Sequence, residues 1–270
     1  MPIPVAILDR KPARKVADVP VEVLDYLNRG LIESKNLTEW LAVDPVELLR
    51  NALPGSWQDR LPELESRVTQ RKKPSTLKIT NVIGNGLREL AKNETEFAAL
   101  AIHLLGHDSD SVRCYYGPMI GGQDIPLAVK LKQLRPLAAD DHFGCREVAF
   151  FSLKPHVVDR EQEAVDLLLP WVSDPDENIH RFAVETMRPI GVWTVHLPSL
   201  KENPEIALPL IVPLLSDPAR YVQNAVANWL NDAAKSQPAW VHNLTEQWLA
   251  KSDSKATAYI VKRGRRSLAK

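Results

Sequence analysis

Three carboxylates in separate segments of helical periodicity are candidates for shared chemistry. Glu147 lies in "GCREVAFFSL", Glu185 in "NIHRFAVETMRPIGVW" and Asp232 in "YVQNAVANWLND". Carboxylates held at one place stabilise a developing positive charge and position a water molecule for attack. We expect the helices that carry these acids to stack in parallel, so that the three side chains converge.

The residues around Glu185 combine charge with an aromatic ring. Arg181 precedes Glu185 by four residues, Arg188 follows one turn later, and Trp193 lies just beyond the expected end of the helix. Arginines of this kind can hold phosphate groups, and a tryptophan ring can face a cation. In the structural alternative, Arg181 and Glu185 form an ordinary surface ion pair and Trp193 fills a gap between repeats.

The helix expected over residues 221–232 has two contrasting stripes. Its apolar stripe, typical of a buried face, comprises Val222, Ala225, Val226, Trp229, Leu230 and Ala233. Its polar stripe comprises Asn224, Asn228, Asn231 and Asp232. Asn and Asp disfavour helix, whereas an ordinary solvated face uses Lys, Glu, Gln and Arg. We expect the short amides to hold Asp232 and to let a backbone or a nucleotide approach closely; in the alternative, Asn228 bonds the backbone of a neighbouring loop.

Basic residues are concentrated near the C-terminus, although 34 basic and 34 acidic residues give the chain a net charge of zero. Residues 251–270 contain one acid, Asp253. Their basic residues are Lys251, Lys255, Lys262, Arg263, Arg265, Arg266 and Lys270. A second, weaker basic cluster covers residues 67–78. A neutral protein that binds nucleic acid must do so through a local patch of this kind, and a solvated surface is the alternative.

Segments of helical period follow one another along the chain, and none alternates as a strand does. Asp174, Asp217 and Asp253 each lie five residues before the residue that opens a helix, and His107 marks a fainter copy. Helical pairs that recur at about 40 residues are typical of HEAT repeats, which stack into a curved α-solenoid. We therefore predict an all-α, HEAT-like repeat domain over residues 1–270, with a distinct helical cap over residues 1–70 as a variant.

The composition, with 44% hydrophobic and 25% charged residues, is that of a globular protein. No apolar run reaches the roughly 18 residues of a membrane span, and the N-terminus does not resemble a secretory signal. Two cysteines, Cys114 and Cys145, are too few for a disulfide framework or a structural zinc site, which favours a reducing cytoplasm. The histidines show no metal-binding pattern, so we expect no metal, no cofactor and no membrane partner.

The stretches "RFAVETMRPIGVW" and "YVQNAVANWLNDAAKSQP" resemble bacterial DNA alkylation-repair glycosylases of the AlkC branch, in the AlkC/AlkD superfamily of HEAT-like repeat proteins. That family has an Arg, a Ser-Glu-Gly, an Arg-Pro and a Trp eight residues after the Glu. The matching residues are Arg181, Glu185, Arg188-Pro189 and Trp193. Its Tyr-Val, Val-Ala-Asn and Leu-Asn-Asp helix is matched by Tyr221-Val222, Val226-Ala227-Asn228 and Leu230-Asn231-Asp232. The segment from Glu147 and the Arg-rich final helix are also similar, so the resemblance covers about residues 140–270.

This resemblance implies a DNA glycosylase that excises cationic N-alkylated bases, of the 3-methyladenine type, from double-stranded DNA. The base leaves as a cation, while the deoxyribose becomes oxocarbenium-like and needs negative charge and a positioned water. Glu147, Glu185 and Asp232 would be catalytic. The implied DNA-binding residues are Arg181, Arg188, Trp193, Tyr221, Asn228, Asn231, Lys262, Arg263, Arg265 and Arg266. Such enzymes work without flipping the base into a deep pocket, and we expect a monomer.

The chain departs from the family pattern beside both glutamates. The replacements are Phe151-Ser152 for the Arg-Pro after Glu147, Val184 and Thr186 for the Ser and Gly that flank Glu185, and His180 for an arginine. The alternative function is therefore a non-catalytic module of the same fold that binds DNA or a protein. A structure that places Glu185 and Asp232 on opposite sides of the molecule, or that locks each of them to an arginine inside packed protein, would argue against catalysis.

Overall fold

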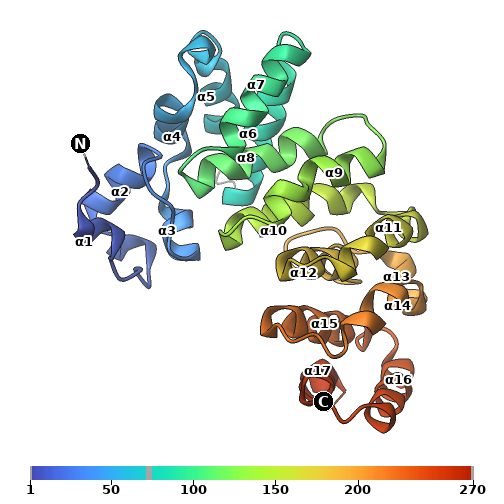
Figure 1. The fold of residues 1–270 in the computed structure, drawn as a ribbon. Helices are drawn as coiled ribbons and strands as arrows, with labels where there is room; N and C mark the ends of the chain where they lie inside the picture. The colour runs from blue at the N-terminus through green and yellow to red at the C-terminus, as the bar shows by residue number, and fades with distance from the viewer. Residues whose placement is uncertain (1, 71–74, 269–270) are drawn as a thin grey trace. The chain divides into compact units, whose positions relative to one another are not determined.

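The computed structural model describes residues 2–70 and 75–268, and every regular element in these ranges is a helix (Figure 1). The all-α prediction is therefore confirmed. Within the same ranges, no helix is long and apolar enough to cross a membrane. Lys270 and residues 71–74 of the second basic cluster lie outside the described residues.

The chain divides into two compact units. The first comprises Met1–Asp124 and Asp140–Ala149, and the second comprises Ile125–Ala139 and Phe150–Lys270. Helix α10 (Phe143–Leu153) contributes residues to both units. Glu147 therefore belongs to the first unit, whereas Glu185 and Asp232 belong to the second.

The first unit begins with short helices and continues with two longer helical pairs. The bounds are α1 (Val5–Leu8), η1 (Val16–Asp18), α2 (Val21–Asn28), α3 (Leu37–Ala42), α4 (Pro45–Ala52), η2 (Gly55–Trp57), α5 (Leu61–Thr69), α6 (Thr76–Leu90), α7 (Glu94–Leu105) and α8 (Asp110–Gly121). Ser75 and Asn93 cap α6 and α7 by accepting a hydrogen bond from a first-turn N–H. Helix α6 packs against α8, the second helix of the next pair.

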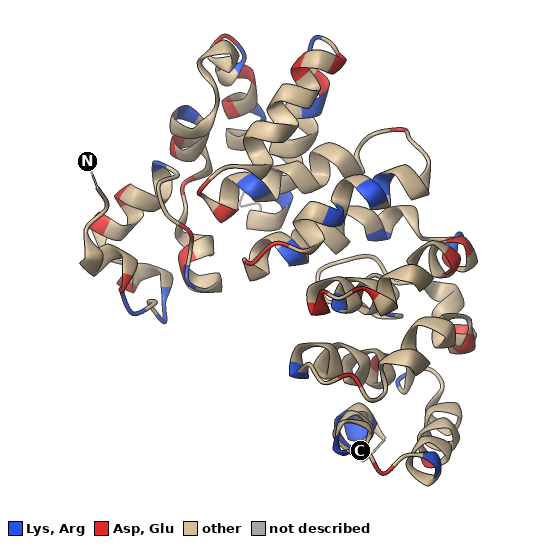
Figure 2. Cartoon of the chain, viewed as in Figure 1, with Lys and Arg blue, Asp and Glu red and all other residues tan. Residues whose placement is uncertain are grey.

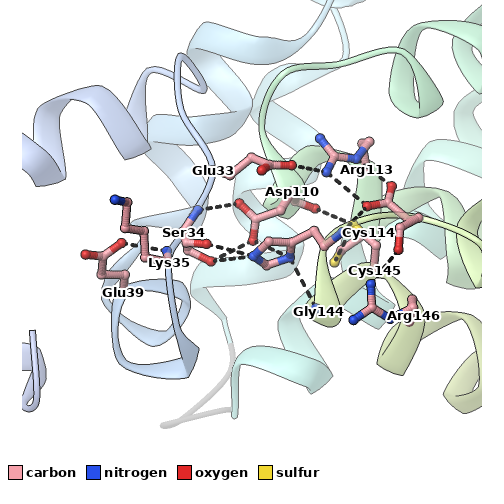
Figure 3. Close-up of polar contacts among 12 residues, drawn as sticks. Glu33, Ser34, Lys35, Glu39, Asp110, Arg113, Cys114, Gly144, Cys145 and Arg146 are labelled. Atoms are coloured by element: carbon pink, nitrogen blue, oxygen red, sulfur yellow. Dashed lines mark hydrogen bonds and ion pairs between the residues drawn. The ribbon is translucent and has the colours of Figure 1, made fainter. Parts of the chain in front are cut away.

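A buried polar cluster ties the segment around Ser34 to α8 and to the start of α10 (Figure 3). The Asp110 carboxylate accepts hydrogen bonds from the Ser34 N–H at 2.9 Å and from its Oγ at 2.8 Å. His142 Nε2 donates to the Ser34 carbonyl at 2.7 Å, and Arg113 pairs with Asp140 at 2.7 Å. Because buried polar groups need partners, the cluster fixes the N-terminal segment within the first unit.

In the second unit, short 3-10 turns extend or follow several helices. The bounds are α9 (Leu127–Ala138), the end of α10, η3 (Lys154–His156), α11 (Glu161–Leu168), η4 (Leu169–Ser173), α12 (Glu177–Thr186), α13 (Pro198–Glu202), η5 (Pro204–Ala207), α14 (Leu208–Ile211), η6 (Val212–Leu214), α15 (Arg220–Ala233), α16 (Pro238–Lys251), α17 (Lys255–Gly264) and η7 (Arg265–Ser267). Helices α12, α15 and α17 are the second helices of successive pairs, and they lie side by side in that order (Figure 1).

One side-chain-capped turn recurs between the helices of the pairs. Asp174 and Asp217 each accept a hydrogen bond from the backbone N–H two residues on, at 3.0 and 2.8 Å. In the fainter copy, His107 Nδ1 accepts the same bond at 3.0 Å, and burial lowers the pKa of His107, which favours the neutral acceptor form. In the last pair Ser252 Oγ, and not the predicted Asp253, accepts this bond at 3.2 Å. The repeated sequence pattern therefore corresponds to a repeated turn, in which a side chain accepts a hydrogen bond from the backbone N–H two residues later.

Candidate active site

Glu185 and Asp232 meet at one guanidinium, that of Arg188. Glu185 lies on the last turn of α12 and Asp232 on the last turn of the neighbouring α15. Arg188 Nη1 donates to Glu185 Oε2 at 3.0 Å, while its Nε and Nη2 lie 2.8 and 2.7 Å from Asp232 Oδ2. The carboxylate residues are 4% and 2% exposed. Stacking of α12 on α15 therefore gathers two of the three predicted acids.

The same contacts bind both acids to a buried arginine, which is the arrangement that argues against catalysis, although the two acids share one guanidinium instead of holding one each. Burial would lower the pKa of Arg188, but the charges of Glu185 and Asp232 raise it, so the guanidinium stays charged. One guanidinium cannot neutralise two carboxylates, and the triad Glu185–Arg188–Asp232 carries one net negative charge. Lys235, whose side chain is 45% exposed, adds an ion pair to Asp232 Oδ1 at 3.0 Å.

Two buried side chains from outside α12 bind backbone carbonyls just beyond the end of this helix. Trp229 Nε1 donates to the Met187 carbonyl at 2.8 Å, and Lys154 Nζ donates to the Arg188 carbonyl at 2.7 Å. Trp229 and Lys154 are both 0% exposed. Arg188 is therefore held through its backbone as well as through its guanidinium.

Arg181 contacts two aromatic rings and does not form an ordinary surface ion pair. Its guanidinium lies over the Tyr221 ring at 4.4 Å and over the Phe150 ring at 5.8 Å. Its Nη2 lies 3.7 Å from Glu185 Oε1, and its side chain is 11% exposed. Tyr221 thus enters the site as a support for Arg181.

Trp193 is 71% exposed, so it does not fill a gap between repeats. It belongs to the segment after Arg188, whose ends are joined by a 3.1 Å hydrogen bond from the Leu197 N–H to the Pro189 carbonyl. Its backbone φ of 64° is left-handed, a conformation that costs a bulky residue about 1–3 kcal/mol. Val192 beside it is 59% exposed. An exposed ring on a strained backbone is a candidate ligand contact.

The polar stripe of α15 faces α17 and η7, where its amide oxygens accept hydrogen bonds. The pairs are Asn224 with the Tyr259 hydroxyl at 2.7 Å, Asn228 with Arg266 Nη2 at 3.0 Å, and Asn231 with Ser267 Oγ at 2.8 Å. The amides therefore dock the last helix instead of holding Asp232. Neither a solvated face nor a loop contact accounts for them.

Basic residues are concentrated on α17 (Figure 2), and the side chains at this end of the chain are divided between exposed and packed positions. Lys262 and Arg263 on α17 are exposed, and so is Arg266, which also binds Asn228. Arg265 instead pairs with Glu246 of α16 at 2.7 Å, and its side chain is 23% exposed. Three of the four predicted phosphate-binding cations are thus accessible in the second unit.

Glu147 lies half-buried on α10 in the first unit, and its catalytic role stays a prediction. Within residues 2–70 and 75–268, no group of three or more His, Cys, Asp or Glu is placed to hold a metal ion. Lys154 was not expected at the site, because nothing in "FSLKPH" marks its ammonium as buried.

Comparison with known sequences points to a single family. A family model described as "DNA alkylation repair enzyme" matches residues 61–268. A Bacillus subtilis (strain 168) relative, "Uncharacterized protein YhaZ", is 32% identical over 120 residues, which are 44% of this chain and 33% of the relative. The match therefore spans about a third of that relative's length.

Solved structures of low sequence identity share the fold. The alkylpurine DNA glycosylase AlkC of Pseudomonas fluorescens, bound to DNA containing an abasic site analog, has a TM-score of 0.67 at 20% identity; the alignment covers 96% of this chain and 66% of that one. AlkD2 of Streptococcus mutans has a TM-score of 0.58 at 23% identity, over 77% of this chain and 97% of its own. The smu.31 protein of Streptococcus mutans UA159 has a TM-score of 0.57 at 24% identity, over 75% and 98%. Built from HEAT-like helical pairs and matched by the family model over residues 61–268, the chain belongs to the DNA alkylation repair enzyme family.

Proposed function

We propose that this protein is a DNA glycosylase that hydrolyses the N-glycosidic bond of cationic N-alkylated bases, of the 3-methyladenine type, in double-stranded DNA. The observation that carries the proposal is the convergence of Glu185 and Asp232 at Arg188, five residues before the exposed Trp193. Membership of the repair family supports it. A monomer in the cytoplasm remains part of the proposal.

The residues suit the charges that develop when such a bond breaks. The base is cationic from the start, so Trp193 can bind it through its ring face, a contact worth about 0.5–2 kcal/mol. The sugar becomes oxocarbenium-like, and the nearby carboxylates of Glu185 and Asp232 stabilise it. Glu185 Oε1 is the oxygen assigned to the sugar and water, since its 3.7 Å ion pair with Arg181 is longer than the bonds to Arg188.

The second candidate, a non-catalytic DNA-binding module, is favoured by the cations around the triad. Lys154, Arg181 and Lys235 surround the two acids, and Arg188 binds both of them. Because these cations outnumber the two carboxylates, the cluster as a whole attracts a phosphate group more strongly than a cationic sugar. Exposed Lys262 and Arg263 would serve either function.

The experiment measures release of methylated base from methylated duplex DNA by the wild type, Glu185→Gln and Asp232→Asn. We expect release by the wild type and a loss of about a hundredfold or more in each variant, with DNA affinity retained. Glu177→Gln is the matched control, because Glu177 is an exposed glutamate on the same helix α12.

Circular dichroism must show that the variants fold, since both substitutions unbalance a buried ion pair. A wild type that binds DNA and releases no base would establish the binding module. Release that persists unchanged in both variants would remove the two acids from the mechanism.

A further inference from the structure

We propose that Lys154 is a positioning residue of this site: its buried ammonium holds the Arg188 carbonyl and the turn that follows it, and so presents Trp193 to DNA. The inference rests on the proposed function for its consequence in catalysis. The positioning itself is a property of the free protein and can be measured without DNA.

The first support is the burial of the lysine. Lys154 is 0% exposed and lies in η3, which directly follows α10. Its Nζ donates to the Arg188 carbonyl at 2.7 Å, across 34 positions of sequence. A buried ammonium is costly unless hydrogen-bonded and compensated by charge. Lys154 is fully buried and binds a backbone carbonyl beside the candidate acids. This arrangement indicates a specific structural role.

The second support is the set of charges that face the ammonium. Burial and the Arg188 guanidinium lower the pKa of Lys154 to about 8, against the attraction of Glu185 and Asp232. The ammonium and the guanidinium therefore share the same two carboxylates. Removing Lys154 changes the charge balance of the triad as well as the support of its backbone.

The third support is the close packing of the turn on the ammonium. A Cβ added to Gly191 would lie 2.9 Å from Lys154 Nζ and would also overlap the Thr194 side chain. A side chain at this position would have to displace the Thr194 side chain and the Lys154 ammonium. Trp193, two residues on, has the left-handed φ of 64°. Such a conformation persists only where its surroundings hold it, and Lys154 lies directly against this turn.

Through these contacts, the position of the exposed Trp193 ring depends on Lys154 in η3. Without the ammonium, the Arg188 carbonyl loses its long-range donor and the 189–197 segment loses its underlying contact. The Trp193 backbone can then relax to an unstrained conformation. The ring moves, while the guanidinium of Arg188 keeps its own bonds to Glu185 and Asp232.

The test compares Lys154→Met with Lys130→Met in the full chain. Lys130 on α9 is 3% exposed and contacts His156 at the end of η3, so its substitution removes a buried ammonium beside the same turn without removing the donor to the Arg188 carbonyl. Acrylamide quenching is measured as the difference between each protein and its Trp193→Phe partner, which isolates the fluorescence of that ring. We expect the Trp193 signal to change in Lys154→Met and to match the wild type in Lys130→Met.

Release of the methylated base tests the consequence of Lys154 for catalysis. In single-turnover assays we expect Lys154→Met to be slower by about tenfold, with DNA affinity changed by less than about threefold, as expected for misplacement of a reacting group. Lys130→Met should match the wild type. If the wild type itself releases no base, the proposed function fails, and the quenching comparison still decides whether Lys154 positions Trp193.

The pH dependence separates positioning from mere packing. Raising the pH through about 8 removes the charge of Lys154 and leaves an amine that still donates to the Arg188 carbonyl. The Trp193 quenching of the wild type should therefore shift only part of the way toward that of Lys154→Met, and Lys154→Arg, which keeps its charge, should show no such shift. If Lys154→Met is unfolded, Lys154→Gln, whose side chain is shorter and uncharged, replaces it in the quenching comparison. Wild-type quenching in a folded variant of either kind would overturn the proposal.

Discussion

Arg188 sets the electrostatic character of the candidate site. It contacts both Glu185 and Asp232, and its carbonyl is bound by Lys154. A buried carboxylate left without its partner cation is strongly unfavourable, whereas an exposed pair contributes little. The two cations on Asp232 differ in this way, because the side chain of Arg188 is 12% exposed and that of Lys235 is 45% exposed.

We therefore expect Arg188→Met to lower the free energy of unfolding by about 3–5 kcal/mol, because two buried carboxylates lose their shared partner. Lys235→Met should lower it by less than about 1 kcal/mol, since that ion pair is half-exposed. Urea denaturation followed by circular dichroism measures both. Equal effects of the two substitutions would show that Arg188 is not the central cation of the site.

Lys154 predicts a pH dependence of stability with a definite sign. Its pKa falls from the usual 10.5 to about 8 in the folded protein, so between these values the unfolded chain binds more protons than the folded one. Stability gained from this group therefore rises with pH from about 8 to about 10.5, by at most about 3 kcal/mol. Denaturation at several pH values should show this rise in the wild type relative to Lys154→Met. Parallel curves would contradict the buried, charged lysine.

At the residue scale, the sequence identified the acidic side chains of the candidate site but not the residues with which they form ion pairs. Glu185 and Asp232 were found because charge on a helix with an apolar stripe is conspicuous, and stacking of α12 on α15 followed from the repeat. Both acids pair with Arg188, and this could not be predicted, because helical periodicity says which residues share a face and not which side chains meet between helices. Lys154 was missed for the same reason, since a lysine before a proline is ordinarily solvated.

At the element scale, the amides of α15 are explained by the closeness of α17. Asn228 and Asn231 accept hydrogen bonds from Arg266 and Ser267, so the two helices meet through short side chains. The apolar stripe of α15 was predictable from its period, and the capped turns from the spacing of Asp174 and Asp217. The use of the amides was not, because a polar stripe looks the same whether it faces solvent, a ligand or another helix.

Gly264 tests how closely α15 and α17 approach. A Cβ at this position would lie 2.8 Å from Leu230 Cβ, so Gly264→Ala should force the helices apart and cost about 1–3 kcal/mol, despite the better helix propensity of alanine. Gly55→Ala is the control, because a Cβ there meets nothing within 4 Å. Thermal unfolding should separate the two variants; a Gly264→Ala protein as stable as the wild type would show that this contact adapts freely.

At the scale of the whole molecule, a chain of zero net charge must bind a polyanion through local patches. The exposed end of α17 provides one, in Lys262 and Arg263, while Arg265 is engaged by Glu246. Each phosphate contact releases counterions, so the affinity for duplex DNA should fall with salt at a slope of about −0.9 for each contact. Removing a patch that binds DNA will therefore change both the affinity and the slope of log affinity against log salt concentration.

We expect the double substitution Lys262→Glu and Arg263→Glu to weaken binding of undamaged and alkylated duplexes alike, because phosphate contacts carry no base information. The plot of log affinity against log salt should become shallower by about 1–2, the value for two lost contacts. Lys251→Glu with Lys255→Glu makes the same change of charge at exposed lysines around the turn between α16 and α17, and it should leave the slope closer to that of the wild type. Fluorescence anisotropy with a labelled duplex, measured at several salt concentrations, provides both quantities. Equal slopes for the two double variants would place the phosphate contacts elsewhere, and an unchanged slope in both would remove this end of the second unit from the DNA interface.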